Sequence, residues 1–322
     1  MMKTALICGI SGQDGAYLAQ LLLQKGYQVW GTSRDAQMCT FANLIRLGIR
    51  EQVEVTSMAL NDFRSVLQVI NKIQPDEIYN LAGQTSVGLS FDQPVESIES
   101  ITLGTLNLLE AIRFTGANIK FYNAGSTECF GETGNQPADE NTPFRPRSPY
   151  AVAKAAAFWE VANYREAYNL FACSGILSNH DSPLRPRRFV TQKIVITACE
   201  IAQGNPEKLY LGNTLIQRDW GWAPEYVESM YLMLQQERPD DYLVATGHTY
   251  QLGDFIREVF ASLNLHWEDH VITDQTLFRP TDIAISQCNP NKAKEKLGWM
   301  AQSDMKDVAR MMVQAVVSDG QS

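Results

Sequence analysis

The chain has 322 residues, of which 45% are hydrophobic and 20% charged, so its composition predicts an ordinary folded protein with one large core or two smaller ones. Its net charge of -9 and pI near 5.0 argue against a general nucleic-acid binder, because such proteins need excess Lys and Arg to displace counterions from phosphates. Any polyphosphate ligand is therefore expected to be held by locally placed arginines.

The cysteines and the N-terminus indicate a reducing compartment. The six cysteines are scattered without a C-x-x-C pair, which fits neither a disulfide framework nor a zinc site, so we expect no metal. The first residues show no signal-peptide cleavage pattern, and no apolar run has membrane-spanning length. We expect a cytoplasmic protein with neither a membrane nor a nucleic acid as partner.

Short apolar runs alternate with stretches of helical period, which predicts a parallel sheet covered by helices on both faces. Leu18, Leu21 and Leu22 form a helical stripe that stops before Gly26, as expected of a C-terminal cap. The expected strands are 4–8, 27–31, 53–57, 77–83, 120–126 and 171–177.

After about residue 178 the alternation loosens. Residues 179–212 carry several prolines and three closely spaced arginines and are expected to face a substrate, whereas the segment starting at Arg218 returns to helical periodicity. Residues 270–300 are irregular and rich in polar turns. The predicted fold class is α/β, a Rossmann-type doubly wound parallel sheet with a second, smaller α/β substrate domain. The expected boundaries are 1–178 and 214–248 for the first domain, and 179–213 and 249–322 for the interleaved second one.

A glycine-rich turn, GISGQDG, follows the first expected strand and opens the first helix. Gly9, Gly12 and Gly15 permit a tight turn, a close approach of the backbone to a pyrophosphate, and close packing of helix on strand. The helix N-terminus adds free N–H groups and the positive end of a dipole. In this strand-turn-helix context the turn predicts a dinucleotide site.

The end of the second strand reads GTSRD. An acidic residue at this position accepts hydrogen bonds from the ribose of NAD, whereas an arginine pairs with the extra phosphate of NADP. Arg34 precedes Asp35, so the sequence favours NADP and leaves NAD open. The alternative interpretation is that both are solvated loop charges.

The segment SPYAVAK places Tyr150 four residues before Lys154 at the start of an expected helix, so both side chains lie on one face. A free tyrosine, with a pKa near 10, is a poor base at neutral pH, but a neighbouring ammonium and a cationic nicotinamide favour phenolate. The strand ending in NAGSTE brings Ser126 and Glu128 to the sheet edge where ligands bind. Ser126 can hydrogen-bond a hydroxyl that is being oxidised, and Glu128 suits an enzyme that removes a proton from carbon, although a surface glutamate at a loop entrance is the alternative.

Together these motifs resemble the GDP-mannose 4,6-dehydratase family of extended short-chain dehydrogenases/reductases. The resemblance runs over essentially the whole chain. It includes GISGQDGAYLAQLLL, YNLAGQTSVGLSFDQP, DENTPFRPRSPYAVAK, NYREAYNLFACSGILSNHDSP, FVTQKI, LGNTLIQRDWGWAPEYVESMYLMLQQ and DDYLVATG, in the family's order.

The resemblance implies a lyase reaction with no net redox change. Tyr150, assisted by Lys154, would take the proton of the sugar 4-hydroxyl while a hydride passes from C4 to NADP+. The 4-ketone acidifies the C5 hydrogen, Glu128 removes it, and water leaves from C6. The hydride then returns to C6 and gives GDP-4-keto-6-deoxy-mannose. Ser126 stands where the family has a threonine or serine.

The resemblance also implies ligand contacts and an assembly. The first domain would bind the cofactor and the second the nucleotide sugar, in a homodimer or homotetramer. The implied cofactor-binding residues, besides Tyr150 and Lys154, are Gly9, Ser11, Gly12, Gln13, Asp14, Gly15, Arg34, Leu81, Gln84 and Ser86. The implied substrate-binding residues are Ser86, Asn179, Val190, Lys193, Arg218, Arg279 and Asp282.

The chain departs from the family pattern at several positions. The family's short R-G-E type sequence is LRPRR here, with Arg185, Arg187 and Arg188, so the substrate loop and the accepted sugar are open to change. Asp35 replaces a second arginine, which leaves the choice between NADP and NAD open. Ala59 replaces an aspartate that contacts adenine in relatives, and Asp282 replaces a glutamate.

Two other functions compete with the dehydratase. One is a GDP-4-keto-6-deoxy-mannose reductase, or a dehydratase of another GDP-hexose or a heptose derivative; Glu128 argues against a pure reductase. The other is a non-catalytic cofactor-sensing protein, which the presence of the tyrosine, the lysine and the strand-end hydroxyl disfavours.

Overall fold

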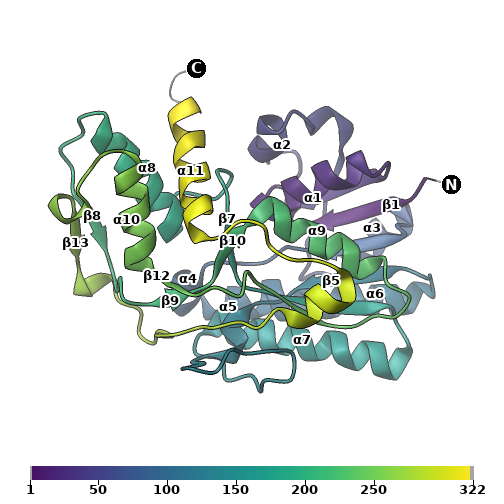
Figure 1. Cartoon of the computed structure of the whole chain (residues 1–322). Helices are drawn as coiled ribbons and strands as arrows, with labels where there is room; N and C mark the ends of the chain where they lie inside the picture. The colour runs from purple at the N-terminus through teal and green to yellow at the C-terminus, as the bar shows by residue number, and fades with distance from the viewer. Residues whose placement is uncertain (1, 320–322) are drawn as a thin grey trace.

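A seven-stranded sheet forms the centre of the computed structural model, which describes residues 2–319 (Figure 1). Its strand order is β11-β6-β5-β4-β1-β2-β3, and every neighbouring pair is parallel. The strands are β1 (Thr4–Cys8), β2 (Gln28–Ser33), β3 (Glu54–Ser57), β4 (Glu77–Asn80), β5 (Lys120–Ala124), β6 (Ala172–Leu177) and β11 (Tyr242–Val244). The chain order reverses between β1 and β4, where the carboxyl ends of the strands leave a crevice for a ligand.

Helices cover both faces of this sheet, as Figure 1 shows for α1 and α9 on one side and α6 and α7 on the other. Strand β1 shows why: Ala5 and Ile7 pack against hydrophobic residues on one face of the sheet, and Leu6 and Cys8 pack against those on the other. The first face carries α1 (Gln13–Gln24), α2 (Ala42–Arg46) and α9 (Ala223–Leu234). The second carries α3 (Phe63–Ile73), α4 (Val87–Asp92), α5 (Pro94–Ser97), η2 (Ile98–Leu103), α6 (Gly104–Thr115) and α7 (Pro149–Tyr168).

A second hydrophobic core lies beside the sheet, where α8, α10 and α11 pack together (Figure 1). Its helices are α8 (Val190–Ala202), α10 (Leu252–Ser262) and α11 (Met305–Asp319). Three two-stranded sheets join it: β7 (Asn179–Asp181) with β10 (Trp220–Trp222), β8 (Leu209–Leu211) with β13 (Val271–Thr273), and β9 (Gln217–Arg218) with β12 (Tyr250–Gln251). Short helical turns are η1 (Arg50–Gln52), η3 (Thr127–Phe130), η4 (Trp267–Asp269), η5 (Gln275–Leu277) and η6 (Ala293–Leu297).

The predicted α/β fold and its six strands are confirmed, with two differences. Strand β11 adds a seventh strand, which the alternation did not indicate because it is only three residues long. The helical period expected from Arg218 begins five residues later, at Ala223, because 217–222 pairs as β9 and β10. Pro224 at the first turn of α9 suits a helix start there.

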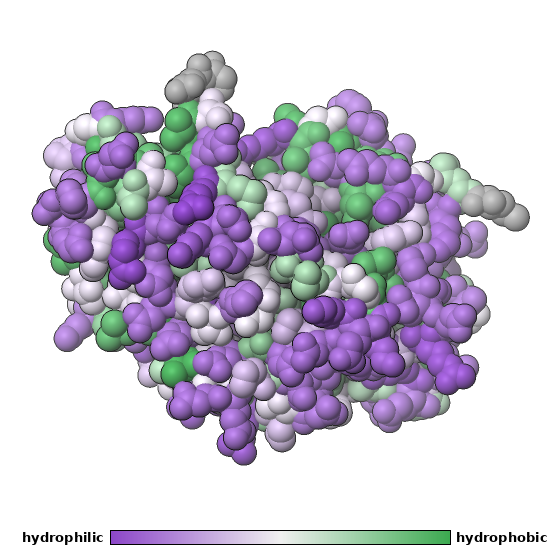
Figure 2. All heavy atoms as spheres, in the orientation of Figure 1, coloured by the Kyte–Doolittle hydropathy of each residue, from purple (hydrophilic) through white to green (hydrophobic). Residues whose placement is uncertain are grey.

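The face drawn in Figure 2 is mostly hydrophilic, with hydrophobic residues scattered among polar ones. Within residues 2–319, none of the helices combines the length and the apolar character that crossing a bilayer requires.

Candidate active site

The turn between β1 and α1 is shaped to receive a pyrophosphate. Gly9 has φ +82°, and a Cβ there would lie 2.9 Å from the Cα of Ala82. A Cβ on Gly15 would lie 2.5 Å from the carbonyl oxygen of Gly9, so neither position tolerates a side chain. Helix α1 begins at Gln13 without a side-chain cap, which leaves its first N–H groups free for an anion.

A cavity of about 380 Å³ opens above this turn. Nine of the predicted cofactor residues line it: Gly9, Ser11, Gly12, Gln13, Asp14, Gly15, Arg34, Leu81 and Gln84. Several other lining residues were not predicted to lie at the cofactor, among them Asn43, Asn61, Glu96, Glu99 and Phe189, and Arg188 was noted only as part of an altered substrate loop. The rigid glycine cradle and the size of the cavity fit a nicotinamide dinucleotide.

The three other predicted cofactor residues, Ser86, Tyr150 and Lys154, lie outside this lining. Ser86 caps α4, accepting from the N–H of Leu89 at 3.3 Å. The side-chain amide of Gln84 donates to the carbonyl oxygen of Ser86 at 2.8 Å. Both therefore shape the loop that follows β4.

Three elements bring the four predicted catalytic side chains to the same edge of the sheet. Ser126 follows β5 and caps η3, which carries Glu128. Tyr150 and Lys154 occupy the first two turns of α7, whose N-cap is Ser148. The Tyr150 hydroxyl hydrogen-bonds to Ser126, and the Lys154 ammonium lies 5.8 Å from the centre of the Tyr150 ring. The predicted tyrosine and serine are thus in contact, and the predicted lysine lies beside the tyrosine ring.

Burial sets the electrostatics of this group. Loss of water raises the pKa of the Tyr150 phenol, although the hydrogen bond from Ser126 opposes the shift. Burial also lowers the pKa of Lys154 to about 8, although its ammonium donates to the carbonyl oxygen of Ala124 at 2.7 Å. The phenol therefore needs an added positive charge, such as an oxidised nicotinamide, before it can act as a base near neutral pH.

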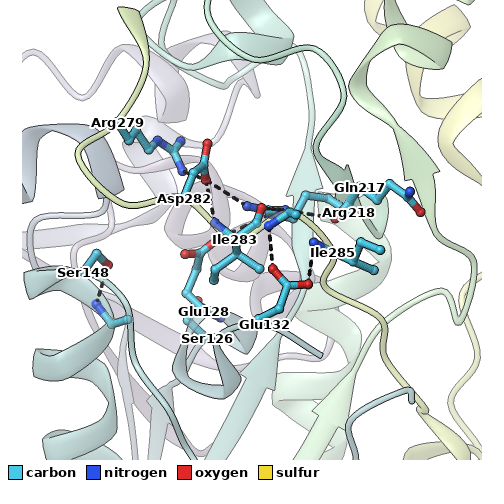
Figure 3. A network of polar contacts seen from close by, with 12 residues as sticks. Ser126, Glu128, Glu132, Ser148, Gln217, Arg218, Arg279, Asp282, Ile283 and Ile285 are labelled. Atoms are coloured by element: carbon cyan, nitrogen blue, oxygen red, sulfur yellow. Dashed lines mark hydrogen bonds and ion pairs between the residues drawn. The ribbon is translucent and has the colours of Figure 1, made fainter. Parts of the chain in front are cut away.

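Glu128 belongs to an ion-pair network with residues far away in sequence, drawn in Figure 3. Its carboxylate lies 3.6 Å from Nε of Arg218, whose Nη2 lies 3.2 Å from Asp282. Arg279 lies 3.4 Å from the same oxygen of Asp282. Arg218 is only 3% exposed and donates to the carbonyl oxygens of Gln217 and Ile283 at 2.9 and 2.7 Å, so its position is fixed. Three predicted substrate residues therefore converge on the predicted base.

Asn179, Val190 and Lys193 lie elsewhere on the second part of the chain. Asn179 begins β7, Val190 begins α8, and the Lys193 ammonium donates to the carbonyl oxygen of Tyr210 at 2.7 Å. Within the described residues, no hydrogen bond or ion pair joins the side chains of these three to the Arg218 network. Their contact with substrate stays a prediction.

Glu132 was missed by sequence reasoning because nothing in GETGN marks it. Its carboxylate accepts from the backbone N–H groups of Ala284 and Ile285 at 2.7 and 2.9 Å (Figure 3). Segment 279–285 carries Arg279, Asp282 and the carbonyl that holds Arg218. Glu132 therefore fastens this segment to the loop that follows Glu128.

We expect Glu132→Ala to raise the KM for a nucleotide-sugar substrate by about tenfold, because hydrogen bonds to a charged acceptor contribute about 1.5–3 kcal/mol and their loss frees the segment that holds Arg218. The Kd for cofactor should stay unchanged. Steady-state kinetics and cofactor titration check both values. The KM of Glu132→Gln, which keeps one acceptor oxygen, should fall between that of wild type and that of Glu132→Ala. An unchanged KM in Glu132→Ala would contradict this role.

A second charged pair links the glycine turn to β7. His180 Nε2 lies 3.0 Å from Asp14 Oδ2, its Nδ1 lies 2.7 Å from the carbonyl oxygen of Ser178, and its ring stacks on Tyr226. Burial would raise the pKa of Asp14, but the charge and hydrogen bond of His180, together with Gln13 and Arg185, outweigh it and lower the value to about 2. Burial would lower the pKa of His180. The charge of Asp14 and its hydrogen bond counter this effect, and the pKa of His180 is raised. The pair connects the cofactor cavity to the second core.

This pair predicts a pH-dependent stability. Asp14 stabilises the folded protein above its ordinary pKa of 3.8, and this stabilisation is lost as the pH falls toward 2. His180 stabilises the folded protein below its ordinary pKa of 6.5, and this stabilisation is lost as the pH rises through the raised pKa of the folded state. The thermal midpoint of cofactor-free Asp14→Asn should therefore differ most from wild type at roughly pH 4–6.5 and less in alkali. A difference that is constant with pH would exclude the charged pair.

Comparison with known proteins identifies the family. The family model for GDP-mannose 4,6 dehydratase matches residues 6–312. The chain is 46% identical over 321 residues to GDP-mannose 4,6 dehydratase 2 of Arabidopsis thaliana, an alignment that covers 97% of this chain and 86% of the relative. The chain belongs to the GDP-mannose 4,6-dehydratase family. It is also 39% identical over 340 residues to the human GDP-mannose 4,6 dehydratase, covering 98% of this chain and 91% of that protein.

The fold is shared more widely than the family. A solved structure of Thermus thermophilus UDP-glucose 4-epimerase in complex with NAD superposes with a TM-score of 0.85 at 26% identity, covering 97% of this chain and 98% of the epimerase. Short-chain dehydrogenase/reductase architecture therefore extends over both cores of the chain.

Two departures from the dehydratase family pattern have structural explanations. The carboxylate of Asp35 accepts from the backbone N–H groups of Gln37 and Met38 at 2.9 and 3.2 Å and does not line the cavity. Within LRPRR, Arg185 and Arg188 line the cofactor cavity, whereas Arg187 pairs with Glu200. The arginine-rich segment thus borders the cofactor side of the site.

Proposed function

We propose that this protein is a lyase that dehydrates GDP-mannose to GDP-4-keto-6-deoxy-mannose. Membership of the GDP-mannose 4,6-dehydratase family supports this activity. The observation that carries it is the convergence of Glu128 with Ser126, Tyr150 and Lys154 at one edge of the sheet. Only a reaction that removes a proton from carbon, in addition to the hydride transfer, needs the carboxylate besides the other three groups.

The residues divide the chemistry among themselves. Ser126 orients the sugar 4-hydroxyl, and the Tyr150 phenolate takes its proton while Lys154 stabilises the phenolate. The nicotinamide, when bound, accepts one hydride from the substrate and later returns it. Glu128 takes the C5 proton, and the C6 hydroxyl leaves as water. Because the hydride would return to C6 while a proton is added back at C5, the reaction needs no external reductant. Arg218 keeps the Glu128 carboxylate in place for this step.

Incubation of the purified protein with GDP-mannose and catalytic NADP+ tests the proposal. Mass spectrometry should show a product that has lost one water, with no net reduction of cofactor. Unchanged GDP-mannose together with consumption of NADPH on a 4-keto-6-deoxy sugar would instead identify a reductase. Turnover of another GDP-hexose or a GDP-heptose in preference to GDP-mannose would change the assigned substrate and leave the assigned reaction, dehydration, unchanged.

We propose NADP as the cofactor. Arg34 lines the cavity at the end of β2, where the ribose of the adenosine half lies in this fold. The carboxylate that would favour NAD, that of Asp35, is used by backbone N–H groups of its own turn. The adenosine ribose of the cofactor would therefore lie beside Arg34, and the Asp35 carboxylate would not contact it.

The division of labour follows the two cores. We propose that residues 1–178 and 214–248 bind the cofactor, and that 179–213 and 249–322 bind the nucleotide sugar. Arg218, which belongs to the first part, and Arg279 of the second meet at the boundary and suit the diphosphate, which would take over the ion pairs that Asp282 makes with both. We assign Asn179, Val190, Lys193 and Ser86 to the remainder of the GDP-sugar.

The assembly we propose is a homodimer, alone or as half of a homotetramer, in the cytoplasm. Val152 and Trp159 on α7 are 47% and 62% exposed, and Val95 and Ile98 on the neighbouring α5 and η2 are 66% and 40% exposed. A second copy packing on these helices would cover this apolar surface. Sedimentation of Trp159→Glu should then give a monomer. All six cysteines are free thiols, which suits a reducing compartment.

A further inference from the structure

We propose that Arg188 is a specificity-determining residue for the cofactor and binds the 2′-phosphate of NADP together with Arg34. The inference rests on the proposed use of NADP and adds a residue from the far side of the cavity, contributed by the segment before α8.

The charges that line the cavity single out Arg188. Of its three arginines, Arg34 pairs with Glu96 at 3.4 Å and Arg185 pairs with Asp181 at 3.1 Å. Arg188 makes no ion pair within residues 2–319, and its guanidinium lies 5.1 Å from the centre of the Phe189 ring. An arginine that faces a ligand cavity without a protein carboxylate is available for an anion of the ligand.

The acidic residues of the same cavity make a second cation necessary. Glu96 and Glu99 both line it, and the side chain of Arg34 is 86% exposed and already paired with Glu96. A phosphate carrying about two negative charges would meet two carboxylates and one solvated arginine. A single exposed ion pair contributes little, so selection for the phosphate requires another positive side chain close by.

Contacts through α2 place Arg188 on the adenosine side of the cavity. Helix α2 follows the end of β2 that carries Arg34, and Asn43 on α2 donates to the carbonyl oxygen of Ser11 at 3.0 Å. Arg46, also on α2, donates to the carbonyl oxygen of Pro183 at 2.8 Å. Pro183, at the start of the segment that carries Arg188, therefore contacts the helix that follows the end of β2. The pyrophosphate, by contrast, has the glycine turn and the N-terminus of α1 as its partners.

The neighbouring Arg187 provides a matched control. Both of its terminal nitrogens bind Glu200 at 2.7 Å, and it does not line the cavity. Arg188→Gln and Arg187→Gln remove the same charge from adjacent exposed positions, so a general effect of net charge would appear in both. Circular dichroism and the thermal midpoint establish that both variants are folded.

Calorimetric titration at fixed ionic strength would use two ligand pairs that differ only by the 2′-phosphate: NADP+ against NAD+, and 2′,5′-ADP against 5′-AMP. Loss of a charge-assisted contact predicts that Arg188→Gln weakens NADP+ and 2′,5′-ADP by about 10- to 100-fold and leaves NAD+ and 5′-AMP unchanged. Arg187→Gln should leave all four unchanged. The affinity of wild type for NADP+ should also fall more steeply with salt than that of Arg188→Gln.

Each other outcome overturns the inference. If Arg188→Gln binds both members of each pair more weakly by the same factor, Arg188 contacts the pyrophosphate. If Arg188→Gln binds all four ligands as wild type does, Arg188 makes no contact with the cofactor. If wild type selects NADP+ and Arg188→Gln selects it equally well, only this inference fails. If wild type does not discriminate within either pair, the proposed cofactor fails with it, whereas the dehydratase activity is tested separately by mass of the product.

Discussion

Tyr150→Phe is expected to reduce kcat on GDP-mannose by about 10²- to 10⁴-fold. The substitution removes the phenol that acts as the general base beside Ser126 and Lys154 and takes the proton of the sugar 4-hydroxyl. The variant should still bind cofactor, since Tyr150 does not line the pyrophosphate end of the cavity. Product formation by mass spectrometry and titration of the cofactor check the two statements.

Tyr168→Phe serves as the control for this variant. Tyr168 closes the same helix and is 48% exposed, so loss of its hydroxyl should leave kcat unchanged. Full activity in Tyr150→Phe would refute the assignment of the base. The wild-type rate should rise with pH, because burial raises the pKa of the phenol and the reaction uses its ionised form.

Glu128→Gln should stop the reaction at a different stage. The amide cannot take the C5 proton, so we expect a loss of product of about 10²- to 10⁴-fold. Oxidation at C4 depends on Tyr150 and Lys154 and should continue. Substrate added to the variant with stoichiometric NADP+ should therefore give the absorbance of reduced nicotinamide without loss of water, a combination that Tyr150→Phe cannot give.

Isotope exchange separates the two steps further. In deuterated water, wild type should introduce deuterium at C5, and Glu128→Gln should not. Glu132→Gln is the comparison within the same loop, because its carboxylate holds Ala284 and Ile285 rather than reaching the substrate, and it should retain exchange at saturating GDP-mannose. Deuterium at C5 in Glu128→Gln would transfer the base to another group and remove the main argument for a dehydratase.

Features that depend on a few neighbouring residues were predictable. The glycine spacing after β1 specified a turn that only residues without Cβ can form, and the four-residue spacing of Tyr150 and Lys154 placed both on one face of α7. Strand β5 likewise delivered Ser126 and Glu128 to its carboxyl end. Helical period, alternation and backbone angles are local properties, so a short window of sequence contains them.

Features that join distant segments were decided only in three dimensions. Glu128 and Arg218 are far apart in sequence, and their meeting depends on β9 being held by β12 and on the segment that Glu132 fastens. The hydrogen bonds that turn Asp35 away from the cavity, and the contact of α2 with Pro183 that brings Arg188 near it, are equally invisible in sequence. Each of these contacts depends on many small packing and hydrogen-bond energies summed over the whole chain. The catalytic motifs, by contrast, lie within single turns and at strand ends, so neighbouring residues suffice to predict them.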